Sequence, residues 1–294
     1  MMKMNQYRYA VAISLVCLAT TSFSAEDVDK KEAAQKLKKN TYELAPVLLK
    51  SDQSDSSTLG LEYSLKGDLF TKDFKKECKE SDDVFNFDCT YGDHGLAYDL
   101  SGVVAENAEN NPKNFLTSEV NYQFSYYGNK HNFRGGAFLQ YETDQKFDNK
   151  QYVYGGTFTY VPDFEELGIN ALKDDTFAAH INLAQVDPKD DTAREAVLED
   201  LDTYDRLGIE LVYKLKIDKG ILKHFEANYR YYKELGADDV IKDAGLDDFR
   251  LVTYRLGLKN GAYVAYSSGE LPFNLQDDQI FEIGYSYSLD KLFD

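Results

Sequence analysis

Strict alternation of apolar and polar residues is the feature that most limits how this chain can fold. Successive side chains of a β-strand point to opposite faces, so each alternating run predicts a strand with one apolar and one polar face. The clearest runs span residues 115–126, 206–216 and 224–232. Weaker runs lie at 42–50, 58–69, 97–105, 131–142, 151–161, 176–186, 248–258, 261–267 and 279–289. The chain is therefore predicted to be all-β, with about 12 antiparallel strands.

The apolar face of these runs is large and rich in aromatic residues. The chain holds 23 tyrosines and 18 phenylalanines but no tryptophan. In a transmembrane β-barrel the apolar face meets lipid, and aromatic girdles mark the two membrane interfaces. The tyrosines expected in these girdles are Tyr126, Tyr127, Tyr152, Tyr154, Tyr160, Tyr231, Tyr232, Tyr285 and Tyr287. We predict an antiparallel transmembrane β-barrel over residues 42–294, with a soluble barrel or sandwich as the alternative.

The first residues have the layout of a secretory signal peptide. Two basic residues precede an apolar stretch at 10–19, and small residues follow at 21–25. This apolar core is shorter than the ~20 residues that a spanning helix needs. Residues 1–24 are therefore predicted to direct export through the Sec pathway, and residues 25–41 to form an N-terminal periplasmic arm. The expected location is the outer membrane of a Gram-negative cell.

The connections between the predicted strands differ in length. Short turns at 218–220 and 260–261 alternate with long segments, as expected for a barrel with turns at one end and loops at the other. The long segments at 187–203, 235–247 and 267–278 carry most of the acidic clusters. Residues 71–94 and 162–175 are too long for the turn end, so either a strand pair is missing from the count or these turns are elaborated.

One long segment also carries a helix signal. Residues 190–198 have helical spacing, with Thr192 as a possible cap and Glu195 three positions later. The prediction is a short helix over the pore mouth.

Charge and cysteine content exclude several classes of protein. The formal net charge of -18 argues against nucleic-acid binding, which needs a basic surface. Cys78 and Cys89 would remain after signal cleavage, and two cysteines 11 positions apart in an exported protein are predicted to form a disulfide. Zinc would need further His or Cys ligands at regular spacing. We therefore expect no metal site and no cofactor.

The last predicted strand carries a motif of its own. Residues 282–289 read Glu-Ile-Gly-Tyr-Ser-Tyr-Ser-Leu, and Glu282, Gly284, Tyr287 and Leu289 occupy the positions of a polar residue, a glycine, an aromatic and an apolar residue. This pattern resembles the C-terminal assembly signal of Gram-negative outer-membrane β-barrel proteins. That signal usually ends the chain on Phe, whereas here five more residues follow. The resemblance implies the barrel architecture and recognition by the barrel assembly machinery, and nothing about a particular solute.

If the apolar positions face lipid, the opposite positions face the lumen. The predicted inward charged residues are Glu62, Lys66, Glu119, Arg134, Glu142, His180, Glu210, Lys214, Glu226, Arg230, Arg255 and Glu282. We predict a porin-like channel for small hydrophilic solutes, because charged side chains in a narrow lumen can line an aqueous path. The residues expected to set its selectivity are Arg134, Arg230, Arg255, Lys214, Glu119, Glu210 and Glu226, and the three arginines form a possible basic track for anions.

Two other functions fit the same barrel. It could anchor acidic surface loops that bind a partner or cations, with outer-membrane lipids and lipopolysaccharide as its surroundings. It could also be a lipid hydrolase. However, His94, His131, His180 and His224 lie in no nucleophile motif, and no Gly-x-Ser-x-Gly is present. The chain is therefore not predicted to be an enzyme.

Overall fold

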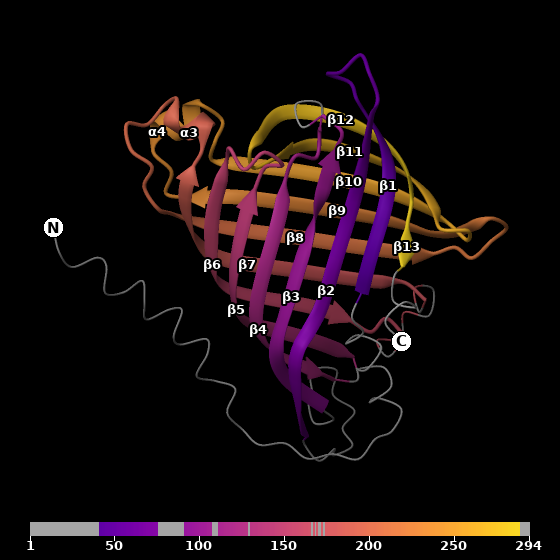
Figure 1. Ribbon diagram of the computed structural model, residues 1–294. Coiled ribbons are helices and arrows are strands. Elements are labelled where there is room, and N and C mark those ends of the chain that lie inside the picture. The colour runs from indigo at the N-terminus through magenta and orange to yellow at the C-terminus, as the bar shows by residue number, and fades with distance from the viewer. Residues whose placement is uncertain are drawn as a thin grey trace.

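The computed structural model describes residues 41–75, 91–107, 111–128, 130–165, 167, 169, 172 and 174–288, and these form a single closed sheet (Figure 1). Each strand pairs antiparallel with the next along the chain. The strands are β1 (Thr41–Ser51), β2 (Thr58–Lys75), β3 (Tyr91–Ala105), β4 (Leu116–Tyr127), β5 (His131–Thr143), β6 (Lys150–Pro162), β7 (Thr176–Asp190), β8 (Tyr204–Lys216), β9 (Leu222–Leu235), β10 (Asp248–Leu258), β11 (Ala262–Leu271) and β12 (Asn274–Tyr285). The prediction of an all-β antiparallel barrel of about 12 strands is confirmed.

The barrel closes because the last long strand returns to the first. Val47 of β1 pairs with Gly284 of β12, and a short strand β13 (Tyr287–Ser288) continues the same edge beyond Ser286. Pro46 lies inside β1, where its missing N–H would weaken a central strand. It stands opposite the break between β12 and β13, so the ladder is interrupted where it lacks a donor.

The two ends of the barrel differ. β1 begins and β13 ends at one end, which we call the terminal end. At the other end, called the helical end, the connections after β7 and β9 carry two short helices, α3 (Thr192–Glu195) and α4 (Asp239–Asp243), which lie together in Figure 1. In the usual outer-membrane arrangement both termini face the periplasm, which would direct the helical end outward.

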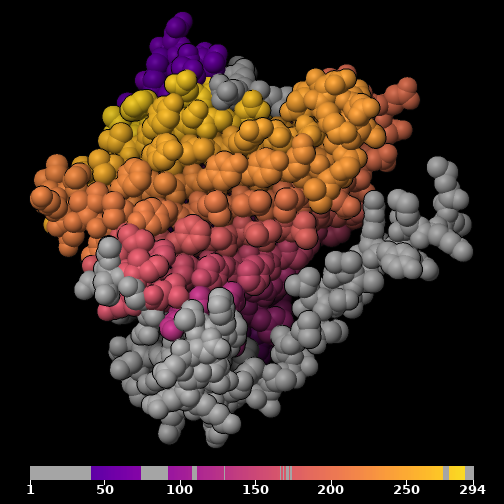
Figure 2. All heavy atoms as spheres, turned by 180° about the vertical axis from the view of Figure 1, so that it is seen from behind, coloured from indigo at the N-terminus to yellow at the C-terminus, as the bar shows by residue number. Residues whose placement is uncertain are grey.

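The outer wall is an apolar belt. In Figure 2 the orange and yellow strands β8 to β12 form a continuous wall. Large apolar side chains that are exposed on the barrel wall include Leu59, Leu61, Val104, Val120, Tyr122, Leu139, Tyr152, Tyr154, Phe158, Ile181, Leu183, Leu211, Leu215, Tyr254, Val264, Phe281 and Ile283. Such a surface would be unfavourable in water, and it matches the lipid-facing band of a membrane barrel. None of the described helices has the length and apolar character needed to cross a membrane.

Aromatic side chains gather on this outer wall near the terminal end. Phe133 lies with its ring centroid 5.3 Å from Tyr160 and 5.8 Å from Phe158. His94 stacks on Phe124 and hydrogen-bonds the Tyr122 hydroxyl at 2.6 Å.

Two tyrosines expected in the girdle are an exception. Tyr127 is 9% exposed and Tyr232 lies under Arg206, so both point inward and their assignment to the girdle is wrong. Each follows another tyrosine, and because faces alternate along a strand, only one residue of such a pair can point outward.

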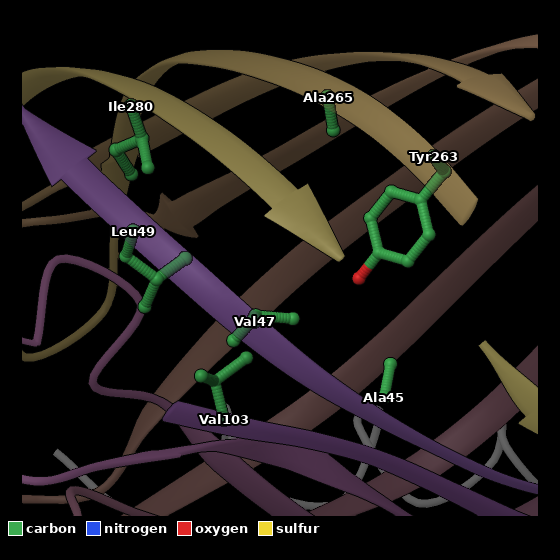
Figure 3. Close-up of a cluster of buried hydrophobic side chains, with 7 residues drawn as sticks. All are labelled: Ala45, Val47, Leu49, Val103, Tyr263, Ala265 and Ile280. Atoms are coloured by element: carbon green, nitrogen blue, oxygen red, sulfur yellow. The ribbon is translucent and has the colours of Figure 1, made fainter. Parts of the chain in front are cut away.

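The interior also contains apolar patches. Figure 3 shows Ala45, Val47, Leu49, Val103, Tyr263, Ala265 and Ile280 gathered on the inner side of the closing seam. The hydroxyl of Tyr263 points away from its own strand, β11. The seam that joins the first and last strands is therefore held by packing as well as by the backbone ladder.

Three predictions about the connections can now be compared with the structure. The predicted long loop at 267–278 is wrong, because β11 and β12 run through it and leave a turn at Pro272-Phe273. Among the described residues the barrel closes without an extra strand pair, and the connection after β6 joins two strands at the terminal end; residues 76–90 lie outside the described part of the chain. The predicted helix exists as α3, but its cap is Asp191 instead of Thr192, since the Asp191 carboxylate accepts from the N–H groups of Ala193 and Arg194.

Candidate functional site

The charged interior is most tightly bonded at the helical end. Arg206 of β8 binds both carboxylate oxygens of Glu142 of β5, with Nη1 2.9 Å from Oε2. Strands β6 and β7 lie between β5 and β8, so this pair bridges strands that do not touch each other. Both side chains are buried, at 5% and 1% exposure. The pair therefore crosses part of the lumen and fixes the shape of the wall there.

Polar and aromatic groups surround this pair. Gln151 donates to Glu142, and Tyr204 reaches Gln151 at 3.5 Å. The guanidinium carbon of Arg206 lies 4.9 Å from the ring centroid of Tyr232. These contacts offset part of the cost of removing the ion pair from water, although Nε of Arg206 is buried without a hydrogen-bond partner among the described residues.

A second network joins the two sides of the closing seam. Arg255 of β10 binds both carboxylate oxygens of Glu62 of β2, at 2.8 and 3.0 Å, across the three intervening strands. The hydroxyl of Tyr263 donates to Glu62 at 2.7 Å and also to Glu282. Lys113, from the connection between β3 and β4, forms an ion pair with Glu282. The strand faces could be predicted from sequence, whereas the partners of each side chain depend on barrel closure.

Gly284 makes room for this network. A Cβ atom placed on Gly284 would lie 2.4 Å from the ring of Tyr263. The glycine is therefore required by the close approach of the tyrosine that binds both carboxylates. Of the residues in the C-terminal motif, Glu282 and Gly284 belong to the interior network, Tyr287 is exposed on β13, and Leu289 lies outside the described residues. Their role in assembly stays a prediction.

The end of the β3–β4 connection also lies inside the helical end. Asn111 is buried and donates to the Val103 carbonyl at 2.9 Å. Phe115 packs on Leu251 of β10 and Leu271 of β11, although the adjoining strand β4 is separated from β10 by five strands. Residues 111–115 therefore bring opposite walls together and narrow the lumen at this level.

Ion pairs nearer the terminal end are more exposed. Arg230 binds Glu210 through Nε at 3.0 Å, and these side chains are 40% and 32% exposed. Lys214 with Glu226 and Lys66 with Asp99 are also inward pairs, in which the lysines are 47% and 56% exposed. Because these side chains point into the barrel, their exposed area can only contact the lumen. The lumen therefore has room for water beside these pairs.

The predicted selectivity residues all lie on the inward face. Glu119 accepts a hydrogen bond from Asn121 at 2.7 Å, and Arg134 pairs in register with Ser125 and Thr159. Arg230 and Arg255 each hold a carboxylate, which neutralises much of the expected basic track. Three residues of these networks were not predicted from the sequence: Arg206, Lys113 and Tyr263. For Arg206 the available signal was its position in the polar half of an alternating run.

Two of the four histidines face outward, and His180 and His224 face inward. His94 and His131 face outward and hydrogen-bond Tyr122 and Tyr160, respectively. His180 faces inward and lies 2.8 Å from the hydroxyl of Thr159 and 3.2 Å from that of Thr157. The neighbouring carboxylate of Glu210 is bound by Asn228 and Arg230. His180 thus has hydroxyl partners, but no carboxylate orients it for nucleophilic catalysis.

The two helices form a small cap at the helical end. Ile241 of α4 packs with Ala237 and Leu246, and Ala193 and Leu198 from the other connection contact the same cluster. Arg194 binds Glu234, and its guanidinium carbon lies 3.9 Å from the ring centroid of Tyr204.

The N-cap residue of α3 is itself affected by this packing. Burial raises the pKa of Asp191, while the hydrogen bonds that its carboxylate accepts from two backbone N–H groups oppose this rise.

Several predictions fall outside the described residues. These are the signal peptide at 1–24, the arm at 25–41 except for Thr41, which begins β1, and the Cys78–Cys89 disulfide. In the described part of the chain, no group of three or more His, Cys, Asp or Glu side chains is arranged to hold a metal ion.

The barrel resembles several solved structures. A structure of the NanC porin matches with a TM-score of 0.48 and 11% identity, over 84% of this chain and 98% of the porin. A loop-deletion mutant of OmpT, an outer membrane protein of Vibrio cholerae, matches with a TM-score of 0.42 and 11% identity, over 85% and 98%. Pseudomonas aeruginosa OprD matches with a TM-score of 0.32 and 9% identity, over 85% and 95%.

Sequence comparisons add no closer assignment. No family model matches this chain, and no curated protein matches it either. The assignment therefore rests on the molecule itself: the sheet closes, its wall is apolar on the outside and its charges pair on the inside. The chain has the architecture of an outer-membrane β-barrel, with twelve main strands.

Proposed function

We propose that this barrel is a narrow outer-membrane channel for small hydrophilic solutes. The observation that carries the proposal is the exposure of inward charged side chains, which reaches 56% at Lys66 near the terminal end. Charges in this position need water or solute beside them. A protein core would bury such groups or replace them with apolar residues.

The packing at the helical end supports a narrow channel. There the Arg206–Glu142 pair is almost fully buried, and Phe115 bridges opposite walls. A solute would meet its tightest passage between these side chains. Size selection at this level would restrict the channel to small molecules.

Conductance across a planar lipid bilayer tests this proposal. The full-length protein should produce discrete, small current steps. Phe115→Ala removes the side chain that packs across the lumen, so its steps should be larger. Phe281→Ala is the matched control, because Phe281 is exposed on the outer wall, and its steps should equal those of the parent protein. A folded protein that carries no current in any variant would contradict the channel.

A sealed anchor is the second candidate, and the packed helical end favours it. In that case the cap built from α3 and α4 would be the functional surface, and the barrel would only hold it in the membrane. The same bilayer measurement separates the two candidates, since a sealed barrel gives no current steps even after Phe115→Ala. Contact with lipopolysaccharide and with the barrel assembly machinery stays a prediction under either candidate.

A further inference from the structure

The inward face can be followed from strand to strand through the register. Glu142, Arg206 and Glu282 are buried on this face, and cross-strand partners share a face. The carboxylates on the inward face of the described strands are Glu43, Glu62, Asp68, Asp73, Asp93, Asp99, Glu119, Glu142, Glu210, Glu226, Glu234, Asp278 and Glu282. The described cationic side chains on it are Lys66, Arg134, Arg206, Lys214, Lys216, Arg230 and Arg255, and two more come from connections: Lys113, which binds Glu282, and Arg194, which binds Glu234. Carboxylates clearly outnumber cations.

The cations on this face are largely compensated. Arg206, Arg230 and Arg255 each hold a glutamate, with contacts of 2.8 to 3.0 Å, and Lys66 lies 2.6 Å from Asp99. These pairs remove most of the positive potential that a mobile anion would need. Lys214 has a longer contact with its carboxylate partner than these four residues, at 3.7 Å from Glu226.

Glu119 is the clearest uncompensated acid. It lies on β4 next to Asp99 in the register, and its hydrogen bond comes from the neutral amide of Asn121 at 2.7 Å. Among the described residues no cation forms an ion pair with Glu119. A carboxylate inside a narrow low-dielectric tube raises the local concentration of cations and repels anions.

We infer that the lumen prefers cations, so that the solutes of this channel are small inorganic cations or small cationic molecules. The inference rests on the proposed channel function and replaces the basic track that the arginines alone would indicate. It depends on the balance of charges among the described inward side chains and on the carboxylate pairs of Arg206, Arg230 and Arg255.

The test is the reversal potential of the full-length protein in a bilayer under a KCl gradient. The expected sign is that of a pore more permeable to K⁺ than to Cl⁻. Glu119→Gln keeps the shape and the acceptor for Asn121, and should lower the K⁺/Cl⁻ permeability ratio roughly two-fold. Lys214→Gln frees Glu226 and should raise that ratio. The two substitutions thus have opposite expected signs.

Asp187→Asn is the matched control. It removes one negative charge from the outward side of β7, where Asp187 pairs in register with the exposed Tyr152. It should leave the ratio unchanged, and a heat-modifiability gel verifies that every variant is folded. A chloride preference in the parent protein, or equal shifts for Glu119→Gln and Asp187→Asn, would overturn the inference while the channel itself stands. Absence of current in the folded parent protein would instead contradict the channel function.

Discussion

The Arg206–Glu142 pair at the helical end of the barrel is buried and joins strands that are not neighbours, whereas the Lys66–Asp99 and Lys214–Glu226 pairs nearer the terminal end join adjacent strands and remain exposed. Arg206 and Glu142 are separated by two strands, while Lys66 and Asp99 face each other across one ladder. Ion pairs of the same chemical type therefore have different roles in the two halves of the barrel. The buried Arg206–Glu142 pair fixes the distance between β5 and β8, and the exposed pairs line a wet part of the lumen. One barrel can combine a rigid constriction with an aqueous vestibule.

The largest expected effect comes from Arg206→Met. It would leave the buried carboxylate of Glu142 without its cation, and breaking a buried pair in this way costs about 3–5 kcal/mol. The free energy of unfolding can be followed in lipid vesicles with urea, using the fraction of protein that migrates as the folded band on an unheated gel. If the free energy of unfolding fell by less than ~1 kcal/mol, the Arg206–Glu142 pair would have as much access to water as the pairs nearer the terminal end.

A smaller loss is expected for Lys113→Met. The substitution removes the cation bound to Glu282 but leaves the hydrogen bond from Tyr263, so the cost should be about 1–3 kcal/mol in the same urea titration. Glu282→Gln combined with Lys113→Met removes both charges and should recover part of the loss. No recovery in the double variant would contradict the direct pairing of these two residues.

Substitutions in the cap formed by α3 and α4 should lower the free energy of unfolding by less. Asp191→Ala removes the side chain that accepts from two N–H groups of α3, which costs about 1 kcal/mol for a typical helix cap. Thr192→Ala is the comparison variant, because Thr192 is the first helical residue and not the cap, and its hydroxyl donates to Asn149 instead of to the helix. The account would be contradicted if Thr192→Ala cost more than Asp191→Ala in the urea titration.

The smallest effect is expected at the terminal end. Lys66→Met breaks a pair in which both side chains have access to water, and such pairs contribute about 0.2–1 kcal/mol. Its loss should also fade when the urea titration is repeated at high salt, since exposed charges are screened. A cost equal to that of Arg206→Met would remove the distinction between the two halves.

Much of the wall could be predicted from the sequence because a strand in a membrane barrel has two unlike environments. The alternation at 206–216 located β8 to within two residues and placed Glu210 and Lys214 inward. It failed at 267–278, where polar residues indicated a loop. Ser267 and Asp278 are buried on the inward face, so their polarity belongs to the lumen instead of marking a break between strands.

The partners of the inward residues could not be predicted in the same way. Glu142 and Arg206 are 64 positions apart, and their contact depends on the curvature of the sheet between them. Lys113 lies in a connection with no strand pattern, and Phe115 is only the first residue of the run at 115–126, so neither position indicates a contact with the opposite wall. These contacts form only when the sheet closes into a barrel. A local two-residue pattern carries no information about which strands closure brings together.

The central claim is that one face of every strand meets lipid and the other meets water, and nitroxide accessibility along β8 tests it most directly. In a Cys78→Ser, Cys89→Ser background, single labels would be attached through Leu211→Cys, Val212→Cys, Tyr213→Cys, Lys214→Cys and Leu215→Cys. In lipid vesicles, collisions with oxygen should be frequent at 211, 213 and 215, and collisions with a water-soluble nickel chelate should be frequent at 212 and 214. Low accessibility to both reagents at the odd positions would place the apolar face in a dry protein interior and contradict the account.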